Sequence, residues 1–155
     1  ILSSDIIRHC KLYTSIFYID NGNLFILFLQ TTMLKISILI PCFNEEKTII
    51  QVLKTIGVQE IKNITLEVIV INDGSSDNSL SLLQENKHLY SRLVNLDENL
   101  GKGGAVIEGL KVAEGDYVLF QDADLEYDPN DYHLILKPVV LLEADTVFGS
   151  SNLAP

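Results

Sequence analysis

Apolar runs of strand length alternate with amphipathic segments of helix length along most of this chain, and this alternation limits its fold more than any other feature. Strands are predicted at 35–40, 66–71, 93–96, 117–120 and 145–148. Helices are predicted at about 45–56, after Ser76, at about 104–113, and at about 130–142 with an interruption near Pro138. Strands and helices that alternate in this way build βαβ units around a parallel sheet. We therefore expect an α/β domain with a mostly parallel sheet.

The composition fits one globular domain and argues against several classes of protein. The chain has 155 residues, 47% of them hydrophobic, and a formal net charge of -10, and one domain of this length can bury a substantial core. The acidic balance disfavours a broad nucleic-acid surface, because phosphate backbones attract lysine and arginine. The apolar runs are too short to cross a bilayer. Cys10 and Cys42 are too few for a disulfide framework, so we expect a cytoplasmic location, or the cytoplasmic face of a membrane.

Residues 1–32 differ from the rest of the chain, because they show no clear helical or strand period. Met33 is the only methionine and stands immediately before the first well-formed strand. A signal peptide fits poorly, because the short apolar run at 24–29 lies far from Arg8 and Lys11 and no small-residue cleavage site follows it. We expect 1–32 to be a non-native or upstream extension outside the fold, and 33–155 to form the domain.

Polar loops follow three of the predicted strands, and a parallel sheet would gather them at one edge, where such folds bind ligands. They lie at 41–46, 72–77 and 122–124. The first two also have a purely structural interpretation, since Asn44 can cap a helix and Asn-Asp-Gly-Ser is ordinary turn chemistry. Turn formation has no need of the Asp73 carboxylate, however. We therefore favour a role for Asp73 in accepting hydrogen bonds from a nucleobase or ribose.

Asp122-Ala123-Asp124 directly follows an apolar run and predicts a metal site. Two carboxylates separated by one small residue can bind a hard divalent cation and leave coordination positions open for phosphate oxygens. The loop is not an EF-hand, because Tyr127 stands where that loop requires glycine. The pattern is that of a nucleotide-diphosphate site, with an ordinary solvated acidic loop as the alternative.

Four segments in register resemble one family. They are SILIPCFNEE at 37–46, VINDGSSD at 70–77, NLGKGGA at 99–105 and QDADLEYDP at 121–129. Together they are similar to family 2 glycosyltransferases, and within that family to the dolichyl-phosphate mannosyltransferase and polyprenyl-phosphate glycosyltransferase branch. The resemblance implies a Rossmann-like GT-A fold with helices on both faces of the sheet and a nucleotide-diphospho-sugar donor carrying GDP or UDP. It also implies Mg²⁺ or Mn²⁺, inversion at the anomeric carbon, and a lipid-phosphate or saccharide acceptor.

The resemblance assigns roles by position. Contacts with the nucleotide sugar fall on Pro41, Phe43, Glu45, Ile71, Asp73, Lys102, Asp122, Ala123 and Asp124. Asp122 and Asp124 are the expected catalytic residues, and together with Glu126 they are the expected metal ligands. Two positions depart from the family pattern. Phe43 stands where this branch often has tyrosine, so stacking survives without a phenolic hydrogen bond, and Ser151 stands where arginine is usual, which weakens the case for a second phosphate contact.

The glycine-rich segment around Lys102 is not a P-loop, because Leu96 stands where the first glycine is required. In the resembling family it opens a helix beside the donor. Lys102 then either helps to neutralise the diphosphate or is a solvated lysine on a glycine turn. Both interpretations remain open.

Two other functions remain as alternatives. A sugar-phosphate nucleotidyltransferase would carry a glycine-rich, arginine-containing loop after its first strand, which 41–44 lacks. A non-catalytic metal- or phosphate-binding α/β module would carry a lysine at a late strand end, which 148–150 lacks. No general base can be assigned, and the acceptor half is expected beyond residue 155. We therefore expect a C-terminally truncated donor-binding part that binds donor without transferring sugar.

Overall fold

In the computed structural model of the chain, residues 13–20, 23–30, 33–142 and 144–147 are described. Strands β1 (Tyr13–Asp20) and β2 (Asn23–Gln30) form an antiparallel pair in which Tyr13 lies opposite Gln30. The sequence analysis predicted no element in this part of the chain, because it found no clear period there, and these two strands are known only from the structure. The dipeptide Asn21-Gly22 between them is typical of two-residue hairpin loops, a signal that apolar periodicity alone does not use. The domain boundary at Met33 stays a prediction.

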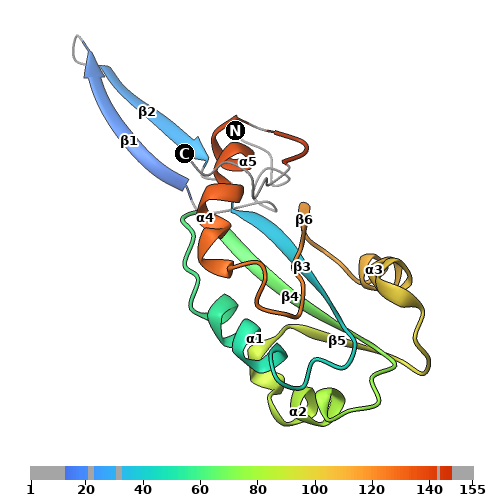
Figure 1. Cartoon of the computed structure of the whole chain (residues 1–155). Helices are drawn as coiled ribbons and strands as arrows, with labels where there is room; N and C mark the ends of the chain where they lie inside the picture. The colour runs from blue at the N-terminus through green and yellow to red at the C-terminus, as the bar shows by residue number, and fades with distance from the viewer. Residues whose placement is uncertain (1–12, 21–22, 31–32, 143, 148–155) are drawn as a thin grey trace, which may run out of the picture.

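Four parallel strands form the main sheet, in the order β5-β4-β3-β6 (Figure 1). They are β3 (Leu34–Cys42), β4 (Ile64–Asp73), β5 (Arg92–Leu96) and β6 (Tyr117–Phe120). The inner strands β3 and β4 are largely buried. Strands covered on both faces read as continuous apolar runs, which is why the sequence predicted them well. The expected parallel sheet is confirmed.

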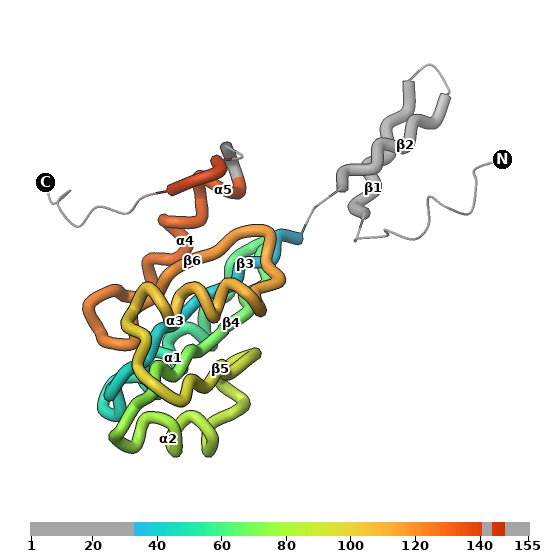
Figure 2. Tube along the Cα trace, turned by 90° about the vertical axis from the view of Figure 1, so that its right-hand side faces the viewer, coloured from blue at the N-terminus to red at the C-terminus, as the bar shows by residue number. Residues whose placement is uncertain are grey.

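Helices cover both faces of this sheet, as expected (Figures 1 and 2). They include α1 (Ile49–Gly57), α2 (Ser79–Glu85), the short turn η2 (Lys87–Leu89) and α3 (Gly101–Leu110). On one face, Ile38 shares a core cluster with Leu53 of α1 and Leu83 of α2. On the other face, Leu39 packs with Ala105 of α3. Neighbouring residues of β3 therefore serve two different cores, because successive side chains of a strand point to opposite faces.

After β6 the chain passes through the acidic loop into short helical turns. These are η3 (Pro129–Asp131), α4 (Tyr132–Ile135) and α5 (Lys137–Leu142). The break between α4 and α5 falls at Leu136, close to Pro138, which lacks the N–H that a continuous helix needs. The predicted strand at 145–148 is wrong for 145–147, which are not in a strand, and residue 148 lies outside the described part.

A buried carboxylate ties the start of β6 to the sheet. Glu67 of β4, 4% exposed, accepts hydrogen bonds from Lys35 Nζ at 2.8 Å, Ser37 Oγ at 2.6 Å and the backbone N of Glu114 at 2.9 Å. Burial opposes ionisation, but these hydrogen bonds lower the pKa of the Glu67 carboxyl to about 2. At Gly115 a Cβ atom would lie 2.6 Å from the backbone N of Ser37. A glycine therefore lets the turn between α3 and β6 approach β3 this closely.

Candidate functional site

The polar loops of the chain meet at the carboxyl edge of the parallel sheet (Figure 1). The loops after β3, β4 and β6 leave the sheet at this edge because the three strands run in the same direction. The connection from β5 to α3 is joined to the end of β4 by a hydrogen bond. The structure thus brings together the loops that the sequence analysis expected at one edge.

Asp73, the last residue of β4, holds the β5–α3 connection in place. It is 2% exposed, and its Oδ1 accepts a hydrogen bond from the backbone N of Leu100 at 2.7 Å. The next residue, Gly74, has a φ of 66°, and a Cβ atom there would lie 2.6 Å from the carbonyl carbon of Glu98. Glycine is required for both reasons. The Asp73 carboxylate, which turn formation does not require, therefore fixes the residue before α3.

The prediction that Asn44 caps a helix is wrong. α1 begins at Ile49 with Thr48 as its N-cap residue. The Oδ1 atom of Asn44 instead accepts hydrogen bonds from the backbone N atoms of Ser76 at 2.8 Å and Asp77 at 3.3 Å. These partners lie in the loop after β4. Asn44 therefore joins the loop after β3 to the loop after β4 and does not cap α1.

The acidic loop is braced from inside by Gln121. This residue is 2% exposed, and its Nε2 donates hydrogen bonds to the carbonyl oxygens of Asp122 and Tyr127, both at 3.0 Å. Its Oε1 accepts a hydrogen bond from the hydroxyl of Tyr132 at 2.9 Å. Asp124 adds a local bond, since its Oδ1 accepts from the backbone N of Glu126 at 2.9 Å. Hydrogen bonds within the loop, together with the contact between Gln121 and Tyr132 of α4, thus fix the backbone around Asp122 and Asp124.

Lys102 at the start of α3 reaches the acidic loop. Its Nζ lies 2.5 Å from Oδ1 of Asp122, and the two side chains are 66% and 24% exposed. The Asp122 carboxylate, which accepts this hydrogen bond, raises the pKa of the Lys102 ammonium above its ordinary value. The glycine-rich segment therefore places a positive charge beside the predicted metal ligands.

The remaining predicted residues take different positions along this edge. Pro41 and Ile71 are register partners on β3 and β4, and the Ile71 side chain is fully buried. Phe43 is 45% exposed, while Glu45 accepts a hydrogen bond from the Thr48 hydroxyl at 2.7 Å. Ala123, by contrast, is buried between the two aspartates. An exposed aromatic ring is thus available at the β3 end of the edge.

Gln121 and Tyr132 are site residues that sequence reasoning missed. A polar residue placed directly after an apolar run was the available signal for Gln121. For Tyr132 no local signal exists, because its partner lies in another element. The pair is recognised only once α4 is seen beside the acidic loop.

The oxygen atoms of Asp122 and Asp124 suit a hard divalent cation, because Mg²⁺ and Mn²⁺ prefer carboxylate and water ligands. Both side chains are partly accessible. Within the residues that the structure describes, no group of three or more His, Cys, Asp or Glu side chains is arranged to hold a metal ion. Two carboxylates leave coordination positions of such a cation open for phosphate oxygens and water. Glu126 as a third ligand stays a prediction.

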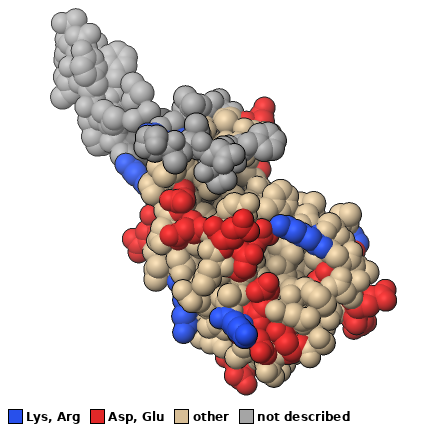
Figure 3. Space-filling model, viewed as in Figure 1, with Lys and Arg blue, Asp and Glu red and all other residues tan. Residues whose placement is uncertain are grey.

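The surroundings of the site are strongly acidic. Acidic side chains gather in the middle of the face shown in Figure 3, in a chain whose formal net charge is -10. A diphosphate would be repelled there unless positive charge compensates for it. Lys102 and a bound divalent cation would both supply such positive charge.

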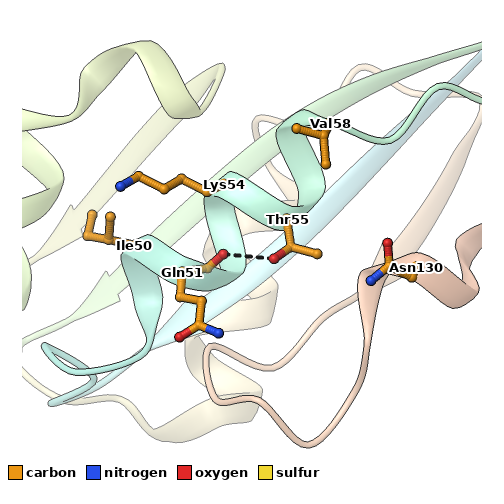
Figure 4. A pocket seen from close by; sticks show the side chains of 6 residues that line it. All are labelled: Ile50, Gln51, Lys54, Thr55, Val58 and Asn130. Carbon is orange, nitrogen blue, oxygen red and sulfur yellow. Dashed lines mark hydrogen bonds between the residues drawn. The ribbon is translucent and has the colours of Figure 1, made fainter.

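Two surface depressions involve other parts of the chain. One has a volume of about 570 Å³ and is lined by Ile50, Gln51, Lys54, Thr55, Val58 and Asn130 (Figure 4). The second, of about 710 Å³, is lined by residues between Ile56 and Val68. Neither includes a residue predicted to contact the donor. The candidate site is therefore defined by the loops at the sheet edge and not by these depressions.

Comparison with known proteins gives a family and solved relatives. The model of glycosyl transferase family 2 matches residues 37–153. The undecaprenyl-phosphate 4-deoxy-4-formamido-L-arabinose transferase of Proteus mirabilis is 36% identical over 101 residues, covering 63% of this chain and 31% of that protein. Glucosyl-3-phosphoglycerate synthase from Mycobacterium tuberculosis, in complex with Mn²⁺, uridine diphosphate and glucosyl-3-phosphoglycerate, matches with a TM-score of 0.58 and 27% identity, over 70% of this chain and 40% of that one.

A mannosyltransferase from Pyrobaculum calidifontis in complex with GDP-Man and Mn²⁺ matches with a TM-score of 0.57 and 25% identity, over 67% of this chain and 32% of that one. This chain spans less than half of the length of each of these relatives. The solved neighbours are GT-A glycosyltransferases, which confirms the expected GT-A fold. In the described part of the chain, every helix is too short or too polar to span a membrane.

Proposed function

The chain belongs to glycosyl transferase family 2, and from this we propose that it binds the nucleotide-diphospho-sugar donor of an inverting glycosyltransferase. The proposed donor carries GDP or UDP, and the proposed acceptor is a polyprenyl or dolichyl phosphate, as in a dolichyl-phosphate mannosyltransferase. One observation carries the proposal. The loops after β3, β4, β5 and β6 are connected along one sheet edge, from Asn44 through Asp73 to the pair of Lys102 and Asp122.

The nucleoside is assigned to the β3 and β4 end of this edge. Exposed aromatic rings such as that of Phe43 stack on nucleobases. Glu45, whose Oε2 accepts from Thr48, has a second carboxylate oxygen for a ribose hydroxyl. We assign the second carboxylate oxygen of Asp73 to the base or ribose. Because Asp73 is buried, this contact requires the loop that carries Leu100 to move.

The diphosphate is assigned to the region between α3 and the acidic loop. Helix N-termini attract anions because their backbone N–H groups and dipole point outward, and α3 begins at Gly101. Lys102 adds a positive charge beside this N-terminus. Asp122 and Asp124 would hold Mg²⁺ or Mn²⁺, which supplies Lewis-acid stabilisation of the charge on the leaving diphosphate.

In the proposed reaction, an oxygen of the acceptor phosphate attacks the anomeric carbon while the bond from that carbon to the diphosphate breaks. The nucleoside diphosphate leaves with the electron pair, and the new bond forms on the opposite face of the sugar. A phosphate acceptor is already an anion, whereas an alcohol acceptor would need a general base. The relative from Proteus mirabilis, whose name includes undecaprenyl phosphate, supports a lipid-phosphate acceptor.

Thermal unfolding in the presence of Mn²⁺ and a panel of nucleotide sugars tests this proposal. A ligand at 100 times its Kd stabilises the folded state by about 2.7 kcal/mol. A UDP- or GDP-sugar should therefore raise Tm by several degrees, while the free sugar at the same concentration should leave it unchanged. A chain whose Tm responds to no nucleotide sugar would contradict the proposal.

A further inference from the structure

We infer that Asn44 is a positioning residue for the nucleotide, an inference that rests on the proposed donor-binding function. Phe43 lies on the loop after β3, and Asp73 stands at the end of β4 where the next loop begins. Both were assigned to the nucleoside. Asn44 links the loop that carries Phe43 to the loop that follows Asp73, so that Phe43 is held in a fixed position at this edge.

The backbone of Asn44 is suited to this link. Its φ of 57° lies in the left-handed region, which asparagine and glycine tolerate better than other residues. The chain bends at Phe43 and Asn44, and the Asn44 side chain contacts the loop after β4. The residue type is therefore restricted by the backbone as well as by the side chain.

The Asn44 side chain makes the central contact. Its Oδ1 accepts from the backbone N of Ser76 at 2.8 Å, from the Ser76 hydroxyl at 3.3 Å and from the backbone N of Asp77 at 3.3 Å. The backbone N of Asn44 donates in the opposite direction, to Ser75 Oγ at 3.1 Å. One residue thus satisfies two backbone N–H groups of a loop that is not its own.

Neighbouring residues extend the same contact. Oε2 of Glu46 accepts from the backbone N and the side-chain Nδ2 of Asn78, at 3.0 and 2.8 Å. The backbone N of Glu46 donates to Asp77 Oδ2 at 3.1 Å, and that of Glu45 donates to Ser79 Oγ at 2.9 Å. Donors and acceptors come from both loops, so the two segments hold each other in place.

Such a link affects affinity because loops that are ordered before a ligand arrives do not have to be ordered by it. The residues from Phe43 to Glu45 precede the turn at 46–48 and lie outside helix and strand, so hydrogen bonds to another loop are what fixes them. Cutting these bonds should weaken nucleotide binding even though no group that touches the nucleotide is removed. Restoring an acceptor at the same place should restore binding.

Three variants of the full chain test the inference, with calorimetric titration of UDP and GDP in Mn²⁺ as the readout. Asn44→Gly keeps the left-handed backbone but removes the acceptor, and we expect about tenfold weaker affinity. Asn44→Asp keeps an acceptor oxygen and should bind within about threefold of wild type. Asn63→Gly makes the same change at another asparagine in the left-handed region, with a φ of 63°, and is the matched control, expected to bind as wild type does.

Hydrogen exchange at the Ser76 and Asp77 amides provides a second readout, because Asn44→Gly should speed exchange at both amides and Asn44→Asp should restore protection. Should Asn44→Gly unfold the chain, Glu46→Ala cuts the bonds to Asn78 and is measured in the same way. Wild-type affinity in Asn44→Gly, or equal weakening in Asn44→Gly and Asn44→Asp, would overturn the inference alone. Failure of wild type to bind either nucleotide would count against the proposed function as well.

Discussion

At the scale of single residues, the buried side chain of Gln121 holds the acidic loop from inside. Its buried side chain donates hydrogen bonds to the carbonyl oxygens of Asp122 and Tyr127. The Oε1 atom of Gln121 accepts a hydrogen bond from the Tyr132 hydroxyl. Burial raises the pKa of that phenol, so it keeps its proton. A buried network of this kind stabilises one arrangement only when every member is satisfied.

Replacing Gln121 by methionine, which has a similar volume, should therefore destabilise the chain. Two partly buried carbonyl groups and the buried Tyr132 hydroxyl would lose their partner, which should lower the free energy of unfolding by about 2–4 kcal/mol. Tyr132→Phe removes only one donor and should cost about 1–2 kcal/mol. Urea unfolding of the two variants measures both values. Wild-type stability of Gln121→Met would show that the hydrogen bonds of Gln121 do not stabilise the fold.

At the scale of elements, β6 is the strand whose placement decides where the acidic loop lies. It is four residues long and pairs with β3. Contacts fix it at both ends, since Gly115 lies against Ser37 and the backbone N of Gln121 donates to the carbonyl of Leu39 at 3.0 Å. A short strand at the end of the sheet is held mainly by such anchors, because few ladder hydrogen bonds are available to it.

Gly115→Ala tests the first anchor. The added methyl group would meet backbone atoms of Ser37 and Lys35 at 2.6 to 2.8 Å, so the turn must shift, at an expected cost of about 1–3 kcal/mol. Gly103→Ala in α3 is the matched control, because nothing lies within 4 Å of its Cβ position. It should stabilise the chain by about 0.5–1 kcal/mol. Thermal unfolding distinguishes them, and equal Tm values for the two variants would contradict the anchor.

Acid titration tests the Glu67 carboxylate, which accepts a hydrogen bond from the backbone N of Glu114, the residue before Gly115. The Glu67 pKa is about 2 in the folded chain and lies below its ordinary value of 4.5, so its contribution is present above about pH 4.5 and is lost as the pH falls toward 2. Glu67→Gln should reduce the free energy of unfolding by on the order of 3 kcal/mol at pH 7. The difference from wild type should shrink as the pH falls toward 2. A difference that stays constant over this range would rule out the ionised carboxylate as its source.

At the scale of the whole molecule, the sequence predicts the parallel sheet and the edge at which the loops gather. β3 and β4 are buried on both faces, so their apolar runs are unbroken, and the direction of the strands then places Asp73 and Asp122 at one edge. The family resemblance rests on short segments that the family match confirms. Apolar periodicity did not predict the β1–β2 pair, because its clearest signal is a turn dipeptide.

Contacts between distant residues could not be predicted in the same way. Asn44 meets Ser76, which lies 32 residues along the chain, and Lys102 meets Asp122 across two elements. Such partners depend on how the loops pack against one another in the tertiary structure. From the sequence alone, an asparagine before a helix is interpreted equally well as a helix cap or as a link to another loop. The site therefore follows from the sequence as a set of loops, while their connections follow only from the tertiary structure.

The central claim is that Asp122 and Asp124 bind the diphosphate of a nucleotide sugar through a divalent cation. Calorimetric titration of the chain with a UDP- or GDP-sugar, in Mn²⁺ and in excess chelator, tests it most directly, with Asp124→Asn as the variant and the exposed Glu60→Gln as the control of equal charge change. The account predicts at least about tenfold weaker binding in chelator and in Asp124→Asn, and wild-type affinity in Glu60→Gln. Equal affinity with and without the metal, or wild-type affinity in Asp124→Asn, would contradict it.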